Sequence, residues 1–592
     1  MTNQSPFHHV FDQLLKMNQQ FLQPLQSQSP TQKALLENQT QDFASLMQSF
    51  SNQPMTHLEQ QMQWWQQQME LFNTCVTGAC SDQTDTDKKA DRRFSDPAWS
   101  ENAFHNYIKQ SYLLTCKNIE ASIASADDLD DPTRHRLEFF TRQFLNAMAP
   151  TNFVMTNPEI LKLTLETNGE NLARGFEQLA KDLSQSADTL NIRMTDEKAF
   201  ILGENIAATP GKVVFQNELF ELIQYQPTTD TVYKRPLLIV PPFVNKYYIM
   251  DLRESRSYIR WLAAQGHTVF CMSWTNPNAE MAATGFENYV LQGVIPALDA
   301  IEKQTGEREV NGIGYCIGGT LLTTTMAYMA AKRTKQRIKS ATLLTTMLDF
   351  SHPGELGVFI SDQMISAIEA QNNIKGYMDG RQMAVSFSLL RENALYWNYY
   401  ITNYLKGESP MAFDLLFWNS DNTNITAACH NQMLRQFYLN NELCEKGKFK
   451  VGNVAIDLQK VNAPVYFMSA IEDHIALWQG TYQGNHLLGG DSTFVLGESG
   501  HIAGPMNHPD AQKYGFWTNA DTKLDARDWL STADKHDGSW WQHWQTWADE
   551  RNFGERIEPR TLQGELDAPG TYVKQRIADV IQATKEEVSH ED

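Results

Sequence analysis

A cysteine, an aspartate and a histidine stand in three short motifs in the second half of this 592-residue chain. The first motif, "NGIGYCIGGT", has the G-x-C-x-G form of a nucleophile elbow, with Cys316 where serine usually stands. A histidine can activate such a thiol, and a carboxylate can orient that histidine. The motif therefore indicates covalent acyl transfer through a cysteine.

The carboxylate and the histidine come from two later peptides. "MSAIEDHIALW" places Asp473 just after the apolar run 463–470, and "VLGESGHIAG" places His501 just after the run 492–497. The carboxyl ends of parallel strands meet at one edge of a sheet, and the chain order nucleophile, acid, histidine is that of α/β-hydrolases. We therefore expect Cys316, Asp473 and His501 to form a catalytic triad.

Neighbouring residues offer alternatives. Glu472 can replace Asp473 as the acid, and His474 and His508 are rival histidines. We expect His474 to point away from Asp473 along an extended stretch, and His508 to lie in a proline-flanked loop. Asp473 and His501 are therefore the preferred pair. The chain has no H-E-x-x-H or comparable pattern, so no metal is expected.

The residues around Cys316 suggest how the transition state is stabilised. Gly314 and Gly318 keep side chains away from the tight turn between a predicted strand and a predicted helix. The amino terminus of that helix offers the backbone N–H of Ile317 as an oxyanion donor. The second donor usually comes from the loop after an early strand, which here is "VPPFVNK" with Val244.

The elements that position these residues follow from the hydrophobic pattern after Gly211. "KVVFQN" and "LFELIQY" alternate like a β-hairpin, whereas the later runs are continuously apolar. Continuous runs belong to strands buried on both faces, so the sheet is predicted to be largely parallel. The later runs are 235–242, 267–274, 309–315, 340–347, 463–470 and 492–497. Helix-length segments separate most of them, one being Asp251 to Gln265, and the pattern predicts an α/β-hydrolase fold.

An insertion of more than 100 residues separates the runs 340–347 and 463–470 and is rich in aromatic residues and methionine. So long a connection is usually functional, and we expect a lid or cap at about 350–440. The alternative is a helical subdomain that packs on the sheet or on a second subunit. Trp418 and Asn419 could belong to such a dimer contact.

The first third of the chain is predicted to be mainly helical, because no strand pattern precedes residue 210. Its first 70 residues hold 18 glutamines, too many for a conventional core. The expected division is a Gln-rich helical segment at 1–76, a linker at 77–93, a helical domain at 94–200 and the catalytic domain at 201–592.

One stripe in the Gln-rich segment has coiled-coil spacing. Leu58, Met62, Trp65, Met69 and Phe72 advance by 4, 3, 4 and 3 residues. The stripe either packs on the rest of the chain or binds a partner or an apolar granule.

Composition narrows the function further. The formal net charge of −21 argues against a nucleic-acid-binding surface, because no basic excess is available to neutralise phosphates. Seven cysteines, an odd number, do not make a disulfide framework, and a reducing compartment fits them best. The amino terminus has no signal-peptide pattern, and no apolar run approaches 18 residues. A cytoplasmic protein is therefore expected.

The motifs together resemble one family, the polyhydroxyalkanoate synthases. The resemblance rests on "GYCIGGT", "EDHIALW", "GHIAG", "VPPFVNKYYIMDL", "FCMSWTNP", "FWNSDNTN", "TNFVMTNPEIL", "GSWWQHW" and "PGTYVK", and it extends from about Phe94 to Lys574. The chain length is that of the single-subunit class I enzymes. One departure is Leu477, where the family often has proline.

The resemblance implies an acyltransferase that polymerises (R)-3-hydroxyacyl-CoA and releases CoA, with Cys316, Asp473 and His501 as its triad. Coenzyme A is then part of the substrate, and no separate cofactor is expected. The expected partners are the growing polymer, the granule surface, a second copy in a homodimer and a phasin-type protein. Short acyl chains are favoured over medium ones. Arg391 and His474 are expected to contact the substrate, Arg391 through the CoA phosphates.

Two other functions stay open. A cysteine-dependent acyl-CoA thioesterase of the same fold would release free 3-hydroxy acid. A granule-associated scaffold with an inactive hydrolase domain would release no CoA.

Overall fold

A computed structural model describes residues 29–77, 91–185, 190–551 and 554–580. The chain forms two compact units. One comprises Met1–Arg193 and Phe387–Pro410, and the other comprises Met194–Ser386 and Met411–Asp592. Most of the expected linker lies outside the described residues. Each unit is described by itself.

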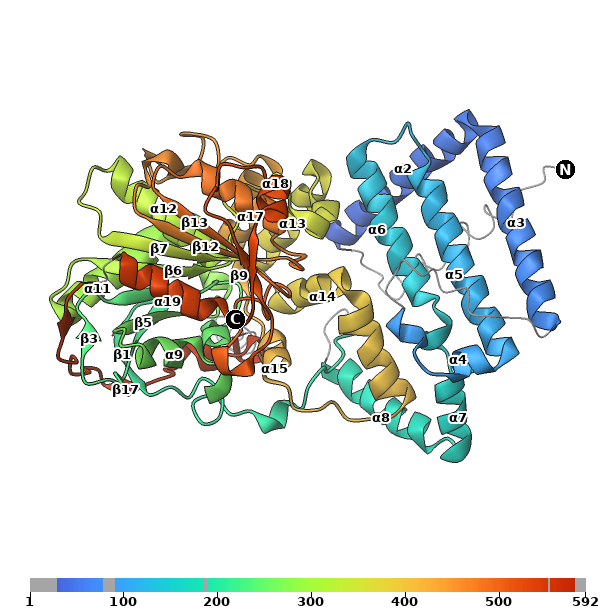
Figure 1. Cartoon of the computed structure of the whole chain (residues 1–592), viewed down its shortest axis with the longest axis horizontal. Helices are drawn as coiled ribbons and strands as arrows, with labels where there is room; N and C mark the ends of the chain where they lie inside the picture. Colours follow the sequence, from blue (N-terminus) through green and yellow to red (C-terminus); the bar gives the residue numbers. More distant parts are fainter. Residues whose placement is uncertain (1–28, 78–90, 186–189, 552–553, 581–592) are drawn as a thin grey trace, which may run out of the picture. The chain divides into compact units, whose positions relative to one another are not determined.

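An eleven-stranded sheet is the centre of the second unit, with the strand order β15-β14-β13-β12-β7-β6-β4-β5-β2-β1-β17 (Figure 1). Its middle strands, from β13 to β5 in this order, pair in parallel, and the strands at both edges pair antiparallel. The strands are β1 (Gly211–Gln216), β2 (Phe220–Tyr225), β4 (Leu237–Val240), β5 (Val269–Trp274), β6 (Val310–Tyr315), β7 (Ile338–Leu344), β12 (Val465–Ala470), β13 (Ser492–Gly497), β14 (Phe516–Thr518), β15 (Asp534–His536) and β17 (Leu566–Asp567). The predicted α/β-hydrolase fold and its largely parallel sheet are confirmed.

Helices cover both faces of this sheet, which is why its central strands are buried along their whole length. One hydrophobic core includes residues of four of these helices, among others, and the other core includes residues of two of them and of the insertion. The first four are α11 (Ile295–Thr305), α12 (Ile317–Ala331), α17 (Trp478–Gly484) and α18 (Ala526–Ser531), and the other two are α9 (Tyr258–Ala264) and α19 (Trp540–Glu550). Indole groups anchor α19, since Trp544 donates to the Thr342 hydroxyl at 2.7 Å.

The predicted helix Asp251 to Gln265 is too long. The regular helix α9 starts at Tyr258, because the Ser257 side chain accepts the N–H of Arg260 and caps it. Asp251 instead accepts a hydrogen bond from the Ser257 hydroxyl at 2.6 Å. The end was predicted correctly, and Gly266 follows it with φ +86°.

The long insertion lies between β7 and β12 and divides between the two units. Its α- and π-helices are α13 (Asp362–Lys375), α14 (Gly380–Leu390), η9 (Asn393–Trp397), η10 (Tyr400–Leu405), α15 (Asp414–Ser420), α16 (Ala427–Gln432) and η11 (Met433–Leu439). The segment Phe387–Pro410 belongs to the first unit, although sequence patterns placed it in the catalytic domain. Trp418 is buried and its indole donates to the carbonyl of Lys246 at 2.7 Å, so this side chain lies inside its own chain and not in a dimer contact.

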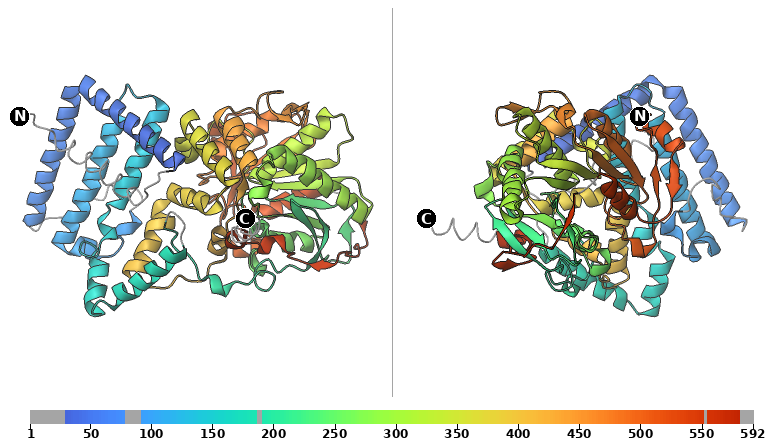
Figure 2. Two further views of the ribbon diagram at one scale, coloured as in Figure 1. Left: turned by 180° about the vertical axis from the view of Figure 1, so that it is seen from behind. Right: turned by 60° about the vertical axis from the view of Figure 1, so that its left-hand side comes forward.

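The first unit is helical. Its longer helices are α2 (Pro30–Asn52), α3 (Pro54–Val76), α5 (Ala103–Ala124), α6 (Asp131–Ala147), α7 (Pro158–Glu166) and α8 (Glu170–Gln185). The helices α3, α5 and α6 lie side by side (Figure 2). The insertion segment 387–410 packs on α8 through buried polar contacts. Asn171 donates to the carbonyl of Leu405 at 2.8 Å, and the Tyr404 hydroxyl donates to Asp182 at 2.7 Å.

The apolar stripe predicted from Leu58 to Phe72 lies on α3 and is at least half exposed. The interpretation in which it packs on the rest of its chain is therefore wrong for most of the stripe, although Phe72 contacts the ring of Tyr107 on α5, with ring centroids 5.8 Å apart.

Candidate active site

Cys316 occupies a strained turn between β6 and α12. Its backbone has φ 52° and ψ −128°, a conformation that non-glycine residues rarely adopt. The N–H of Cys316 donates to the carbonyl of Leu344 at 2.9 Å, and its carbonyl accepts from the Thr346 hydroxyl at 3.2 Å. These bonds to the end of β7 hold the turn in place, with the thiol half-buried at the carboxyl edge of the sheet.

Three glycines make this turn sterically possible. A Cβ on Gly314 would lie 2.3 Å from the Cα of Gly319, and a Cβ on Gly318 would lie 2.2 Å from the carbonyl oxygen of Val240. A Cβ on Gly319 would meet the Thr346 hydroxyl at 2.0 Å. The glycine pattern of the motif therefore has a packing cause, the close approach of α12 to the neighbouring strands.

Asp473 follows β12 and is buried. One carboxylate oxygen, Oδ1, accepts the backbone N–H groups of Ile475 at 2.8 Å and Ala476 at 2.9 Å. The other oxygen, Oδ2, lies 2.7 Å from Nδ1 of His501. The local turn therefore fixes the carboxylate and directs one oxygen to the histidine.

His501 follows β13 and is buried too. Its carbonyl accepts a hydrogen bond from the Tyr315 hydroxyl at 3.1 Å, which ties it to the strand that precedes the nucleophile. Burial by itself lowers the pKa of His501, but the charges of Asp473 and Cys316 and hydrogen bonds to both side chains raise it to about 10. Asp473 and Cys316 thus both favour the protonated ring of His501.

The rival residues have different surroundings. Glu472 is exposed, whereas its buried neighbour Asp473 makes the contact with His501. His508 accepts the backbone N–H of Asp510 and packs edge-on against Trp541. The structure therefore brings together the preferred pair of acid and histidine. His474 is half-buried, and its expected contact with the substrate stays a prediction.

The two expected oxyanion donors lie on elements that meet at the elbow. Ile317 is the first residue of α12, so its N–H has no acceptor within the helix. The loop after β4 approaches the elbow at Gly318, where the carbonyl of Val240 and the backbone of Pro241 lie. Val244, further along this loop, packs against the same hydrophobic core as Ile317.

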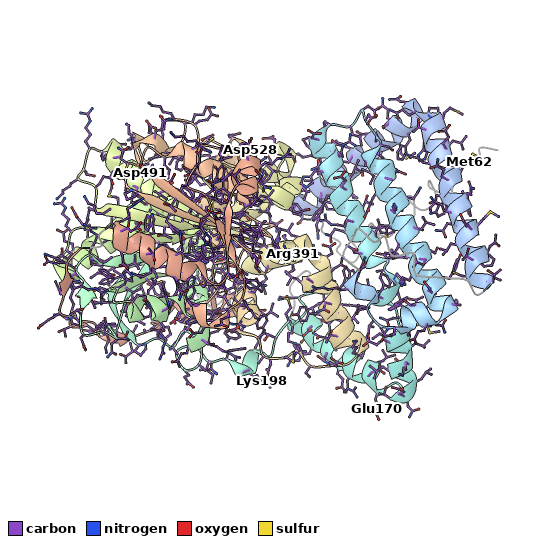
Figure 3. The ribbon with its side chains drawn as sticks, viewed as in Figure 1. Met62, Glu170, Lys198, Arg391, Asp491 and Asp528 are labelled. Atoms are coloured by element: carbon purple, nitrogen blue, oxygen red, sulfur yellow. The ribbon has the colours of Figure 1, made fainter. Side chains whose placement is uncertain are left out.

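Arg391 is exposed and belongs to the insertion segment of the first unit (Figure 3). Its expected contact with CoA stays a prediction. Sequence reasoning missed Tyr438, which η11 of the insertion contributes. Burial and the charge of Cys316 raise the pKa of the Tyr438 phenol, so its ring lies within electrostatic reach of the thiol. An aromatic residue in a helical pattern gives no signal of this proximity.

Leu477 keeps the local turn despite the missing proline. It precedes α17 with φ −50°, close to the angle that proline imposes. Trp478 is accordingly still the first residue of α17 and is buried. Among the described residues, no cluster of three or more metal-ligating side chains occurs, and none of their helices has both the length and the apolar character needed to span a membrane.

Comparison with known proteins gives consistent results. Residues 90–262 match the family model "Poly-beta-hydroxybutyrate polymerase (PhaC) N-terminus", and residues 236–505 match the "alpha/beta hydrolase fold" model. A solved monoacylglycerol lipase of Paleococcus ferrophilus is 13% identical with a TM-score of 0.31, covering 48% of this chain and 90% of that chain, a likeness too distant to inform function.

The curated relatives are much more similar. The Poly(3-hydroxyalkanoate) polymerase of Methylorubrum extorquens is 44% identical over 91% of this chain and 90% of that protein. The Poly(3-hydroxyalkanoate) polymerase subunit PhaC of Rhizobium meliloti (strain 1021) is 45% identical over 83% of this chain and 80% of that protein. With its elbow, sheet and matched length, the chain belongs to the poly(3-hydroxyalkanoate) polymerase family.

Proposed function

We propose that this acyltransferase polymerises (R)-3-hydroxyacyl-CoA through thioester intermediates on Cys316. Family membership supports the polymerisation of hydroxyalkanoates. The observation that carries the finer proposal is the buried pair in which Asp473 Oδ2 lies 2.7 Å from His501 Nδ1, while the charge of Cys316 helps to raise the pKa of the same imidazole.

In the first step, His501 takes the proton of the Cys316 thiol, and Asp473 stabilises the imidazolium. The thiolate attacks the carbonyl carbon of the acyl-CoA thioester, and the Ile317 and Val244 N–H groups bind the resulting oxyanion. The bond between the carbonyl carbon and the CoA sulfur then breaks. The CoA sulfur leaves with the proton from His501, and the acyl group remains on Cys316.

In the second step, the 3-hydroxyl of another hydroxyacyl unit attacks the acyl group on Cys316. His501 accepts the hydroxyl proton, an ester bond forms and the carbon–sulfur bond to Cys316 breaks. We propose that Asp473 also helps to activate this hydroxyl. If Asp473→Asn slows acylation of Cys316 as severely as chain elongation, this additional role is refuted.

The chemistry explains why a thiol suits this reaction. Loading from CoA exchanges one thioester for another, so the acyl group keeps its thioester free energy. Transfer to an alcohol is then downhill. A serine ester would lose this driving force at loading, and elongation would become an exchange of one ester for another in competition with water.

The remaining functional expectations are parts of the same proposal. The only small-molecule requirement is the acyl-CoA itself, and His474 and Arg391 are its proposed binding residues. The enzyme works at the surface of polymer granules in the cytoplasm, as a homodimer and beside a phasin-type partner. A lid formed by the insertion keeps water from Cys316, while the growing chain leaves by an exit path.

The test is CoA release from (R)-3-hydroxybutyryl-CoA by the wild type and by Cys316→Ala, with turbidity followed in parallel. We expect CoA release with rising turbidity in the wild type and neither in the variant. Cys444→Ala, at a half-buried cysteine outside the site, is the matched control and should behave as the wild type. CoA release in clear solution would identify a thioesterase. Absence of release with short and with longer acyl chains would identify a scaffold.

A further inference from the structure

The helix α3 has an unusual distribution of side chains. Its less exposed face carries Trp64, Leu71 and Cys75 together with two hydrogen-bonded glutamines. Gln68 is buried and donates to the Thr115 hydroxyl at 3.2 Å, and its oxygen accepts from the Ser111 hydroxyl at 2.9 Å. Nearer the start of α3, Gln60 donates to the Ser125 hydroxyl at 3.0 Å. Hydrogen bonds from Gln60 and Gln68 therefore help to attach this helix to its own unit.

A second set of apolar residues lies on the more exposed side of α3. They follow each other at intervals of 3, 4, 3, 4, 3 and 4 residues and are 50% to 69% exposed, and Figure 3 labels one of them, Met62. They are Met55, Leu58, Met62, Trp65, Met69, Phe72 and Val76. This is a seam of alternating a and d positions over three heptads, which we call the α3 seam. Such a narrow seam packs better against another helix than against a broad flat surface.

The size and charge of the α3 seam favour a second copy of the same helix. Its exposed area is on the order of 800 Å², which is what each partner contributes to a standard stable interface. The helix contains no lysine or arginine, so it has no basic side chain that an anionic lipid surface would attract. Glu59 and Glu70 are its only carboxylates, so two copies meet with little repulsion although each chain carries a net charge of −21.

We infer that the α3 seam pairs with the α3 seam of a second copy of this chain. The contact is isologous, because the same residues form both sides. It gives the expected homodimer an interface within the first unit, built by Met, Leu, Trp and Phe side chains that are otherwise exposed to water.

The test compares two variants of the full chain by sedimentation equilibrium. Met62→Glu with Met69→Glu places two charges in the α3 seam, and Gln63→Glu with Gln67→Glu places the same two charges on exposed positions beside it. We expect the seam variant to raise the dimer Kd at least 100-fold, since each buried charge weakens the contact by about tenfold or more. The control should change the Kd less than threefold. Both should keep the far-UV circular dichroism of the wild type, because all four positions are exposed.

Two results overturn the inference. One is an equal Kd for the seam variant and the wild type. The other is a monomeric wild type. In that case, loss of cosedimentation with polymer granules in the seam variant would show that the α3 seam binds the polymer surface instead.

A second inference concerns Lys246 and rests on the proposed oxyanion role of Val244. Lys246 lies two residues after Val244, in the loop between β4 and the short helix η4 (Tyr247–Met250). Its side chain is buried, and Nζ donates to the carbonyls of Val573 at 3.0 Å and Gln575 at 2.5 Å. A buried ammonium group thus connects this loop to the C-terminal segment of the same unit.

That C-terminal segment is itself firmly attached. The Glu221 carboxylate accepts the N–H of Thr571 at 2.9 Å, the Thr571 hydroxyl at 2.6 Å and the N–H of Tyr572 at 3.0 Å. The side-chain oxygen of Gln575 accepts the N–H of Asn276 at 2.9 Å. The acceptors of Lys246 are therefore held in place by β2 and by the end of β5.

The insertion holds the same loop from another side. The Trp418 indole bonds to the Lys246 carbonyl, Asn245 pairs with Asn422, and the Tyr248 hydroxyl donates to Asp421 at 2.9 Å. Burial lowers the pKa of Lys246, and the charge of Asp421 opposes this effect. The loop that carries Val244 is thus fixed by residues distant in sequence.

We propose that Lys246 is a positioning residue that sets the Val244 N–H for oxyanion binding. Lys246→Met keeps the length of the side chain and removes both hydrogen bonds. We expect the rate of acylation of Cys316 by acyl-CoA to fall about 10- to 100-fold, up to the loss measured when one oxyanion donor is removed. The rate and pH profile of Cys316 alkylation by iodoacetamide should stay within twofold, because alkylation needs the thiolate and no oxyanion donor.

Lys339→Met, at a partly exposed ion pair with Glu309, is the control and should change neither rate. Equal losses in alkylation and acylation would assign Lys246 a structural role only, and an unchanged acylation rate would overturn the proposal. Failure of the proposed function itself can be distinguished from these outcomes, because Cys316→Ala would then still release CoA.

Discussion

Asp473 binds His501 with only one of its two carboxylate oxygens. Oδ2 meets Nδ1 of the imidazole at 2.7 Å, while Oδ1 is occupied by the backbone N–H groups of Ile475 and Ala476. The turn after β12 therefore fixes the orientation of the Asp473 carboxylate independently of His501. Because each oxygen has its own partners, a substitution that removes the negative charge of Asp473 but keeps the backbone contacts can test what that charge contributes.

Asp473→Asn should abolish most activity while it preserves the fold. An amide oxygen can still accept the two backbone N–H groups, so the amide nitrogen faces Nδ1 of His501. That forces the proton of the neutral ring onto Nε2, which then cannot accept the thiol proton. We expect CoA release to fall about 10³- to 10⁴-fold, with little change in Tm. A loss smaller than tenfold would contradict the assigned role.

The raised pKa of His501 predicts a pH dependence of stability. In the folded protein this pKa is about 10, and the unperturbed value is 6.5. The folded state therefore binds the proton more tightly than the unfolded state. The stabilisation of the fold by protonated His501 is fully present below pH 6.5 and is lost as the pH rises through 10.

Urea unfolding of the wild type and His501→Gln between pH 6 and 10 measures this contribution. We expect the difference in unfolding free energy to shrink by a few kcal/mol at most as the pH increases, about 1.4 kcal/mol for each pH unit where the effect is complete. A difference that grows with pH would reverse the assignment.

Gly318→Ala should disrupt the elbow itself. The added Cβ would lie 2.2 Å from the carbonyl oxygen of Val240, a backbone atom that cannot move without shifting β4. We expect a loss of activity of more than about 100-fold and a destabilisation of about 1–3 kcal/mol from overpacking. Gly480→Ala is the control, because its Cβ would meet no atom closer than 3.5 Å. Wild-type activity in Gly318→Ala would contradict the close approach of α12 to the end of β4.

Tyr404→Phe tests the attachment of the insertion segment to the first unit. The Tyr404 hydroxyl donates to Asp182 at 2.7 Å, and Asp182 also pairs with Arg193. Loss of a hydrogen bond to a buried carboxylate should lower the unfolding free energy by about 1.5–3 kcal/mol. Tyr399→Phe, on the same segment, should change it by less than about 0.5 kcal/mol. Equal effects of the two substitutions would argue against the contact.

The positions of the candidate site residues could be predicted from the sequence because these positions depend on local patterns. A glycine-flanked cysteine between a strand and a helix, and polar residues at the ends of continuous apolar runs, predict both the parallel sheet and the residues at its carboxyl edge. Cys316, Asp473 and His501 lie where these patterns place them.

Only the tertiary structure determined which surfaces the apolar residues cover. Trp418 is buried and its indole donates to the Lys246 carbonyl, whereas the residues of the α3 seam are exposed, although both belong to apolar patterns in the sequence. The segment 387–410 joins the first unit across about 200 residues of chain, through contacts such as Asn171 to Leu405. Periodicity identifies the apolar face of an element, but the partner of that face is set by long-range packing, to which no local pattern refers.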